Sequence, residues 1–110
     1  MQHISVEQLD SWLVDSARPA PLLLDVREAW EFNLCHLDDA RSMPMNSVPQ
    51  HLAELQAASA TTEIVCICHH GMRSLQVAEF LEQQGCSGMA NLNGGIDAWA
   101  QQIDPEMARY

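Results

Sequence analysis

Apolar blocks alternate with amphipathic blocks along this chain, and the two kinds of block predict strands and helices in turn. Short apolar runs predict strands at 21–27, 62–68 and 89–95, with a shorter extended piece at 40–45. Stretches with apolar residues on one helical face predict helices at 4–14, 28–34, 47–58, 74–85 and 95–103. No internal repeat or low-complexity linker interrupts this alternation.

Several helix boundaries carry recognisable signals. Ser5 and Gln8 have the spacing of a capping box, in which each side chain bonds the backbone of the other residue. Ser47 and Gln50 repeat this spacing before the helix predicted at 47–58. Gly85 follows the last periodic residues of the helix predicted at 74–85 and is expected to stop it.

Strands that alternate with helices at this spacing predict an α/β domain with a mainly parallel sheet. A length of 110 residues suits one domain, and we expect residues 1–110 to form it. In such sheets, ligands bind beyond the carboxyl ends of the strands. Two of the predicted strand ends carry polar or reactive side chains there: Asp25 with Arg27, and Cys68.

The charge balance narrows the classes of partner. Five basic residues, all arginine, stand against fifteen acidic residues, so the formal net charge is −10. A surface of this charge repels phosphate backbones and anionic lipids, and we expect neither a nucleic acid nor a membrane as partner. No apolar run approaches the roughly 20 residues that span a bilayer.

The N-terminal residues and the cysteines indicate a compartment. The first twenty residues carry Glu7, Asp10 and Asp15 and lack the basic start of a signal peptide. Without such a signal, the four cysteines are expected to be reduced thiols. The sequence therefore predicts a cytoplasmic protein.

The segment around Cys68 concentrates the unusual chemistry of the chain. It leaves an apolar strand and enters an amphipathic helix, so backbone N–H groups and the positive end of the helix converge there. Gly71 permits a tight or left-handed backbone, Ser74 is expected to cap the helix, and Arg73 should lie at the rim. The loop is thus predicted to be an anion site.

Cys68 begins this loop, which places its sulfur at the focus of the donors. A helix N-terminus and neighbouring cations favour the thiolate form of a cysteine. The alternative is an inert cysteine buried at a strand end, as most isolated cysteines are. The combination of Cys68 with Gly71 and Arg73 favours a thiolate nucleophile.

These residues carry a family resemblance. The run Cys68-His69-His70-Gly71-Met72-Arg73-Ser74 resembles the active-site loop of rhodanese-like sulfurtransferases, Cys-x-x-Gly-x-Arg-Ser. "LLLDVREAWEF" and "NLNGGIDAW" resemble two further motifs of that family, in the right order and spacing. "CHLDDARSMP" is similar to the family's Gly-His-Ile-x-Gly-Ala stretch, with both glycines replaced.

The resemblance implies a rhodanese-like fold, with a central sheet of about five strands and helices on both faces. It implies that the Cys68 thiolate takes sulfane sulfur from a donor such as thiosulfate or a persulfide. The resulting persulfide would pass its sulfur to cyanide, a thiol or a protein, with no cofactor and no metal. Residues His69, His70, Gly71, Met72, Arg73 and Ser74 would bind the anion. Asp25 and Arg27 would lie beside the loop and orient it. A close alternative is that the two residues form an ion pair that only fixes packing at the strand end.

Other functions compete with this one. Related phosphatases use a loop that is one residue longer than the four residues between Cys68 and Arg73, and a shorter loop suits sulfur better than a phosphoryl group. A binding module with the same fold usually lacks the cysteine or the loop pattern, and both are intact here. A persulfide carrier that delivers sulfur to a protein needs the same loop, so the sequence does not separate it from an enzyme.

Two histidines and a further cysteine leave their roles open. A histidine titrates near 6.5, so His69 and His70 would make the positive charge of the loop depend on pH, and thiosulfate turnover would weaken above neutrality. Both are equally well read as surface side chains. Cys66, Cys68 and the two histidines lack the usual spacing of a zinc site. Cys35 is either a resolving thiol or inert.

Overall fold

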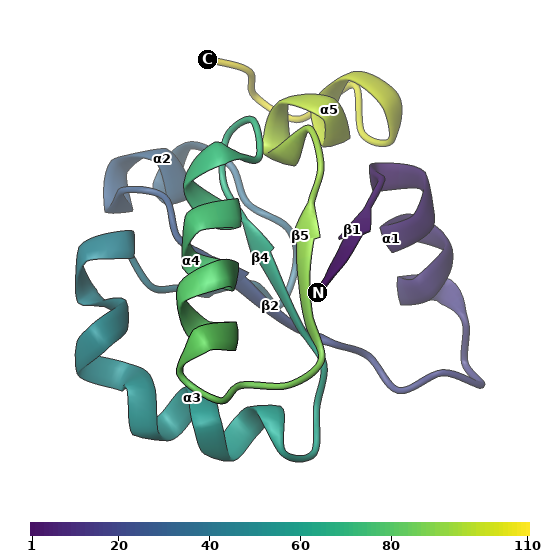
Figure 1. The fold of residues 1–110 in the computed structure, drawn as a ribbon. Helices are drawn as coiled ribbons and strands as arrows, with labels where there is room; N and C mark the ends of the chain where they lie inside the picture. Colours follow the sequence, from purple (N-terminus) through teal and green to yellow (C-terminus); the bar gives the residue numbers. More distant parts are fainter.

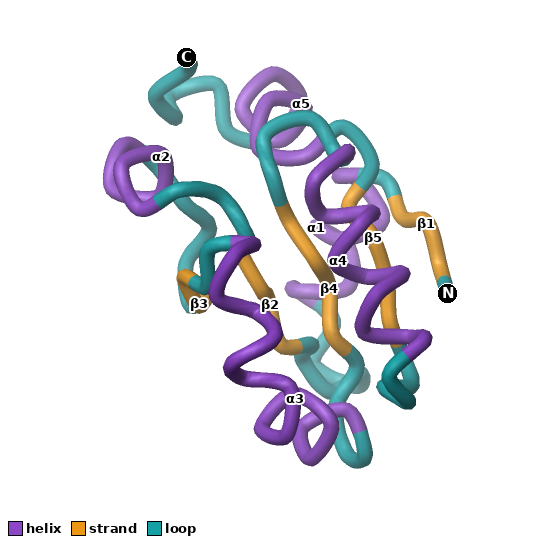
Figure 2. The backbone as a smooth tube through the Cα atoms, turned by 60° about the vertical axis from the view of Figure 1, so that its left-hand side comes forward, coloured by secondary structure: helices purple, strands orange, loops and turns teal.

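A computed structural model describes all 110 residues of the protein. Its centre is a five-stranded sheet in the order β1-β5-β4-β2-β3, in which every pair of neighbours is parallel. The strands are β1 (Gln2–Ile4), β2 (Leu22–Asp25), β3 (Arg41–Ser42), β4 (Ile64–Ile67) and β5 (Met89–Leu92). Figure 2 shows them side by side in this order. The expected parallel sheet is confirmed.

Helices cover both faces of the sheet, as expected (Figure 1). One face packs against a 3-10 helix, η1 (Met45–His51), and against α3 (Leu52–Ser59) and α4 (Met72–Gln83). The other face packs against α1 (Val6–Val14) and α5 (Gly95–Gln102). The short helix α2 (Ala29–Leu34) follows β2. None of these helices has both the length and the apolar character needed to cross a membrane.

The central strand β4 divides its side chains between two hydrophobic cores. Ile64 and Cys66 belong to the core under α4, whereas Val65 and Ile67 belong to the core under α1 and α5. Successive residues of a strand point to opposite faces, so a strand covered on both sides must be apolar throughout. All four residues of β4 are buried, which explains why the run predicted as a strand at 62–68 is apolar at its centre.

Two local expectations need correction. Strand β1 was not predicted, because it has three residues and only Ile4 is buried. The capping box expected from Ser47 does not form: its hydroxyl donates to the carbonyl oxygen of Pro44, and the chain there is a 3-10 helix that contains Pro49. The box between Ser5 and Gln8 is present, with both of its hydrogen bonds.

The parallel topology gathers three loops at one edge of the sheet. The residues after β2, β4 and β5 all leave the carboxyl ends of neighbouring strands, and each leads into a helix. Backbone hydrogen bonds continue past the strand ends: the N–H of Val26 donates to the carbonyl of Ile67 at 2.9 Å. The Asp25–Arg27 segment and Cys68 therefore lie close together, at the carboxyl ends of the strands where ligands bind in parallel sheets.

Candidate active site

Cys68 is the first residue after β4, and residues 68–74 form what we call the Cys68 loop. The backbone N–H of Gly71 donates to Sγ of Cys68 at 3.0 Å, and Oγ of Ser74 lies 3.3 Å from the same sulfur. Only 1% of Cys68 is exposed. The surface hollows of the protein lie elsewhere, and none is lined by a residue of the loop. The sulfur is thus enclosed by polar groups rather than displayed in an open pocket.

The Cys68 loop offers backbone donors that the protein itself does not use. Gly71 has a φ of 103°, and this left-handed conformation turns the chain into α4. N–H groups without an acceptor in the chain belong to His69, His70, Met72, Arg73 and Ser74. Three of these lie in the first turn of α4, where the helix dipole adds positive potential. The loop therefore has the donors of an anion site.

The expectation that Ser74 caps the helix is wrong. Helix α4 begins at Met72 with Gly71 as its N-cap, so Ser74 lies in the first turn and is fully buried. The left-handed Gly71 starts the helix earlier than the sequence suggested and turns Ser74 inward. Its hydroxyl donates to Oδ1 of Asn91 at 2.5 Å, beside the sulfur of Cys68.

Asn91 is a buried residue of β5 that the sequence analysis missed. Only 2% of it is exposed, and its side-chain amide donates to the carbonyl oxygen of Gly71 at 3.1 Å. The amide oxygen accepts from Ser74, so both ends of the side chain are held. Buried polar side chains persist where they are hydrogen-bonded. An asparagine inside an apolar strand was the signal that could have revealed it.

The start of α5 supports the other side of the loop. The N–H of Ile96 donates to the carbonyl of Cys68 at 2.9 Å, and the N–H of Asp97 donates to that of His69 at 3.0 Å. Gly95 precedes them with a φ of 59°, and a β-carbon there would collide with both carbonyl groups. The second glycine of "NGG" is therefore needed for this close approach.

Arg73 is paired with an acid that the sequence did not single out. Its two terminal nitrogens bind Oε1 and Oε2 of Glu31, in α2, at 2.6 and 2.9 Å. Glu31 is 3% exposed, and the hydrogen bonds from Arg73, which outweigh its burial, lower its pKa from 4.5 to about 2. The carboxylate in turn raises the pKa of Arg73. The Arg73 guanidinium is therefore charged, but both of its terminal nitrogens are already bound to Glu31.

Asp25 and Arg27 form a buried ion pair. Nη2 of Arg27 lies 2.7 Å from Oδ2 of Asp25, and neither side chain is more than 1% exposed. Burial works against the charge, but hydrogen bonds to Asp25 and Tyr110 raise the pKa of Arg27. Arg27 also donates to the carbonyl of Cys35 at 2.7 Å. None of its hydrogen bonds reaches residues 68–74, so the pair does not hold the Cys68 loop directly.

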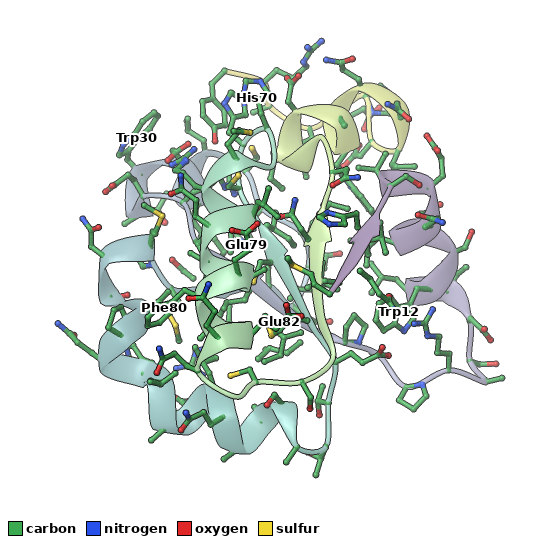
Figure 3. The ribbon with its side chains drawn as sticks, in the orientation of Figure 1. Trp12, Trp30, His70, Glu79, Phe80 and Glu82 are labelled. Carbon is green, nitrogen blue, oxygen red and sulfur yellow. The ribbon has the colours of Figure 1, made fainter.

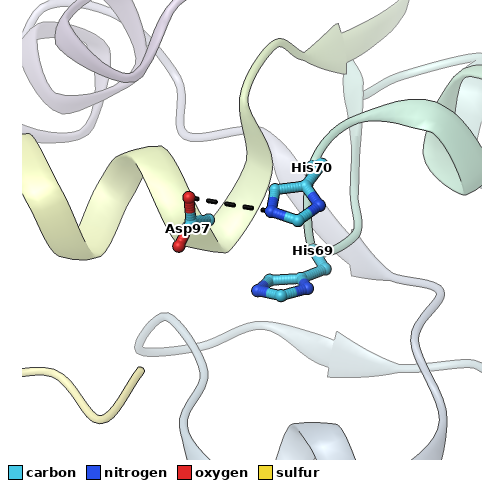
Figure 4. A group of neighbouring side chains, drawn as sticks. All are labelled: His69, His70 and Asp97. Carbon is cyan, nitrogen blue, oxygen red and sulfur yellow. Dashed lines mark ion pairs between the residues drawn. The ribbon is translucent and has the colours of Figure 1, made fainter. Parts of the chain in front are cut away.

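Figure 4 shows His69 and His70 of the Cys68 loop beside Asp97 of α5. Their rings are stacked, with centroids 4.0 Å apart, and Nε2 of His70 lies 3.7 Å from Oδ2 of Asp97. Ligand atoms of the three residues fall within 4.8 Å of one another. Asp97 already binds Gln101 and Arg109, and the two histidine rings are already stacked on each other. The group is therefore a weaker metal site than its composition suggests.

The remaining cysteines differ in exposure. Burial, reinforced by the neighbouring thiols of Cys68 and Cys86, raises the pKa of Cys66 to about 12. Cys66 and Cys86 are buried, whereas Cys35 is partly exposed. All four cysteines are free.

Comparison with known proteins agrees with this geometry. The rhodanese-like domain family matches residues 5–102. A sulfurtransferase of Allochromatium vinosum is 33% identical over 108 residues, which cover 98% of this chain and 96% of the relative. The chain also matches longer proteins named adenylyltransferase and sulfurtransferase, from Ogataea parapolymorpha (32% identical) and Zea mays (29%), but it spans only 26% and 21% of their lengths.

Solved structures show the same fold. A crystal structure from Staphylococcus saprophyticus aligns with a TM-score of 0.81 and 29% identity, over 99% of this chain and 100% of that one. The human single-domain sulfurtransferase TSTD1 aligns with a TM-score of 0.75 and 26% identity, over 93% and 97% of the two chains. Sequence match, fold and relatives agree, and the chain belongs to the rhodanese-like domain family.

Proposed function

We propose that this protein is a sulfurtransferase in which Cys68 carries the sulfur as a persulfide. The observation that carries the proposal is the setting of the Cys68 sulfur, between the N–H of Gly71 at 3.0 Å and the hydroxyl of Ser74 at 3.3 Å. Donors fixed around a sulfur stabilise its anionic form and the anionic product of its reaction. The sulfurtransferase of Allochromatium vinosum, matched over nearly its whole length, supports the same chemistry.

The reaction has two displacement steps. The Cys68 thiolate attacks the outer sulfur of thiosulfate, a bond forms between the two sulfur atoms, and sulfite leaves with the electron pair of the broken S–S bond. The terminal sulfur of the Cys68 persulfide then bonds to the acceptor, and the thiolate leaves with the electron pair. With cyanide the product is thiocyanate, and a thiol or a protein thiolate gives a new persulfide. No external oxidant or reductant is needed.

The loop suits the persulfide intermediate. Its terminal sulfur is anionic and extends one bond beyond Sγ, toward N–H groups that have no acceptor in the chain. Because these donors are held by the start of α4 and by the bonds from α5, they need no reorganisation when the charge arrives. This supports nucleophilic catalysis by Cys68 with His69, His70, Gly71, Met72, Arg73 and Ser74 as its surroundings.

The bonds between Arg73 and Glu31 argue against a phosphatase function. Enzymes that bind a phosphoryl group through an arginine use its two nitrogens on the phosphoryl oxygens. Here both nitrogens of Arg73 bind Glu31, and the other nearby arginine, Arg27, is buried against Asp25. The backbone N–H groups of the loop that have no acceptor in the chain are free to bind a sulfur anion. Four free thiols accord with a reducing compartment such as the cytoplasm.

The test is the intact mass of the protein after incubation with thiosulfate, and separately with glutathione persulfide. We expect the wild type to gain the mass of one sulfur atom and to lose it again when cyanide is added. Cys68→Ser should gain nothing, whereas Cys35→Ser, which removes the partly exposed thiol, should load like the wild type. No gain with either donor, or a gain in Cys68→Ser, would overturn the proposal.

A further inference from the structure

Tyr110 contacts the Cys68 loop itself, helix α2 and the segment that follows strand β2. The chain after α5 returns across the end of the molecule that carries the loop, the end at which Figure 3 labels His70 and Trp30. The Tyr110 ring stacks on the His69 imidazole, with centroids 4.0 Å apart and planes at 10°. Its edge meets Trp30 of α2 at 5.7 Å and 68°. The side chain is 37% exposed, so it forms part of the outer wall of the site.

The hydroxyl of Tyr110 fixes the polar part of the same wall. It donates to Oε2 of Glu31 at 2.7 Å and accepts from Nη1 of Arg27 at 3.0 Å. The single proton and an oxygen lone pair are both used. Oε2 of Glu31 is also the oxygen that binds Nη2 of Arg73. The hydroxyl thus joins the buried pair at the end of β2 to the acid that holds Arg73.

We propose that Tyr110 is a positioning residue of this site, which holds the His69 side of the loop with its ring and the Glu31–Arg73 pair with its hydroxyl. This rests on the proposed function and deepens it. Asp25 and Arg27, expected to orient the loop, do not bind it, and Tyr110 is the link through which they act. The two contacts are independent: the stack ends on His69, early in the loop, and the hydrogen-bonded bridge ends through Glu31 on Arg73, late in the loop.

The two contacts have separable effects. Loss of the hydroxyl removes one donor from Glu31 and one acceptor from Arg27, so Arg73 becomes less firmly anchored. Loss of the ring also exposes His69 to water. The groups that face His69 are His70 in its own loop, Asp97 in α5, Glu31 in α2 and Arg73 in α4. Burial is the main reason why the pKa of His69 is lowered, so exposure should raise it.

Tyr110 is the only tyrosine in the chain, which allows a direct measurement of its docking. Burial and the bond to Glu31 raise its pKa from 10.0 to about 12. Ultraviolet absorbance of tyrosinate in the folded wild type, with folding followed by circular dichroism, should therefore show no ionisation at pH 10, where the protein in guanidinium chloride is half ionised. Half ionisation at pH 10 in the folded protein would overturn the proposal.

The second measurement compares Tyr110→Phe with Tyr110→Ala by NMR titration of the His69 ring. We expect Tyr110→Ala to raise the pKa of His69 toward 6.5 and Tyr110→Phe, which keeps the stack, to leave it unchanged. KM for thiosulfate should rise about threefold in Tyr110→Phe and about tenfold in Tyr110→Ala, with kcat less affected. Val14→Ala, which trims a side chain that is 77% exposed in α1, is the control.

Unchanged His69 titration and unchanged KM in Tyr110→Ala would overturn the positioning role. The tyrosinate and NMR readouts do not depend on sulfur transfer. If Cys68 never loads sulfur, the proposed function fails, while these readouts still report whether Tyr110 holds His69. The two ideas can therefore fail separately.

Discussion

Ser74 donates its hydroxyl proton to Oδ1 of Asn91 at 2.5 Å, while its oxygen lies 3.3 Å from the sulfur of Cys68. One hydroxyl has one proton, so it cannot serve both acceptors at once. A neutral Cys68 thiol can donate to the Ser74 oxygen, and that arrangement satisfies all three groups. When the sulfur becomes anionic, the proton has a stronger acceptor on that side. The Ser74 hydroxyl can thus donate either to Asn91 or to the anionic sulfur, and the strength of its bond to Asn91 decides how easily it turns to the sulfur.

Replacing Asn91 with leucine tests this arrangement. The carbonyl of Gly71 loses its buried donor, so we expect the free energy of unfolding to fall by about 1–3 kcal/mol. The loop is then held less firmly, and kcat/KM for sulfur transfer should fall about tenfold or more. Chemical denaturation and the cyanide assay measure the two effects. Asn33→Ala changes an exposed asparagine in α2 whose side chain makes no hydrogen bond, and it should alter stability by less than about 0.5 kcal/mol.

An Asn91→Leu protein with wild-type stability and turnover would mean that Ser74 needs no partner. The conservative variant Ser74→Ala separates the two contributions. It removes the hydroxyl from Cys68 and from Oδ1 of Asn91 but keeps the bond between Asn91 and Gly71. It should therefore lower turnover while the loop keeps its buried bond to Asn91.

Gly95 is expected to be indispensable for the loop. A β-carbon there would meet the carbonyl groups of Cys68 and His69, and φ is positive as well. Gly95→Ala should therefore destabilise the protein by at least about 2 kcal/mol and abolish sulfur loading of Cys68. Gly85→Ala is a matched control, because φ is 91° there but nothing lies within 4 Å of the new β-carbon. It should cost only about 1 kcal/mol and leave loading intact.

Thermal denaturation and the mass measurement compare these two glycine variants. Equal losses of stability would show that positive φ alone matters at Gly95. Sulfur loading that persists in Gly95→Ala would show that the carbonyl contacts with α5 do not position Cys68.

Local signals in the sequence were enough to predict four of the five strands of the sheet, and the loop. The apolar run of β4, the loop from Cys68 and the glycine pair at the start of α5 each lie within a short stretch, where spacing dictates backbone shape. The other residues of the site form hydrogen bonds and ion pairs with residues that are far away in the sequence. Glu31 and Arg73 are 42 residues apart in sequence, and Tyr110 and Glu31 are 79 apart.

Such distant pairs leave no periodic trace, because the spacing of apolar residues records which side of an element is buried and not which polar group it meets. Ser74 illustrates the limit at short range. Its capping role was inferred from residue type, but the left-handed Gly71 starts the helix earlier. A glycine permits a left-handed backbone without requiring it, so the sequence alone does not show where the helix begins.

Glu31 should make stability depend on pH in the acid range. Its pKa is lowered from 4.5 to about 2, so its contribution is fully present above about pH 4.5 and is lost as pH falls toward 2. Glu31 is buried while Arg73 is partly exposed, so we expect the contribution to be of the order of 2 kcal/mol. Urea denaturation of wild type and Glu31→Gln at pH 6 and pH 3 measures it.

The difference in stability between these two proteins should shrink between pH 6 and pH 3. A difference that stays constant would contradict the ion pair. Glu54→Gln is the control: Glu54 also pairs with an arginine, Arg41, but both side chains are well exposed. Solvent screens that pair, so its variant should follow the wild type closely.

His69 should set the pH dependence of donor binding, at a lower pH than an ordinary histidine. Burial and the charge of His70 lower its pKa below 6.5, so its positive charge disappears before neutrality is reached. KM for thiosulfate should therefore rise with pH already below pH 6.5, and His69→Gln should flatten this rise. His70→Gln removes the repulsion and should move it to higher pH. His51→Gln, on the distant α3 side, should leave it unchanged. A rise that survives in His69→Gln would assign the charge that attracts the donor to another group.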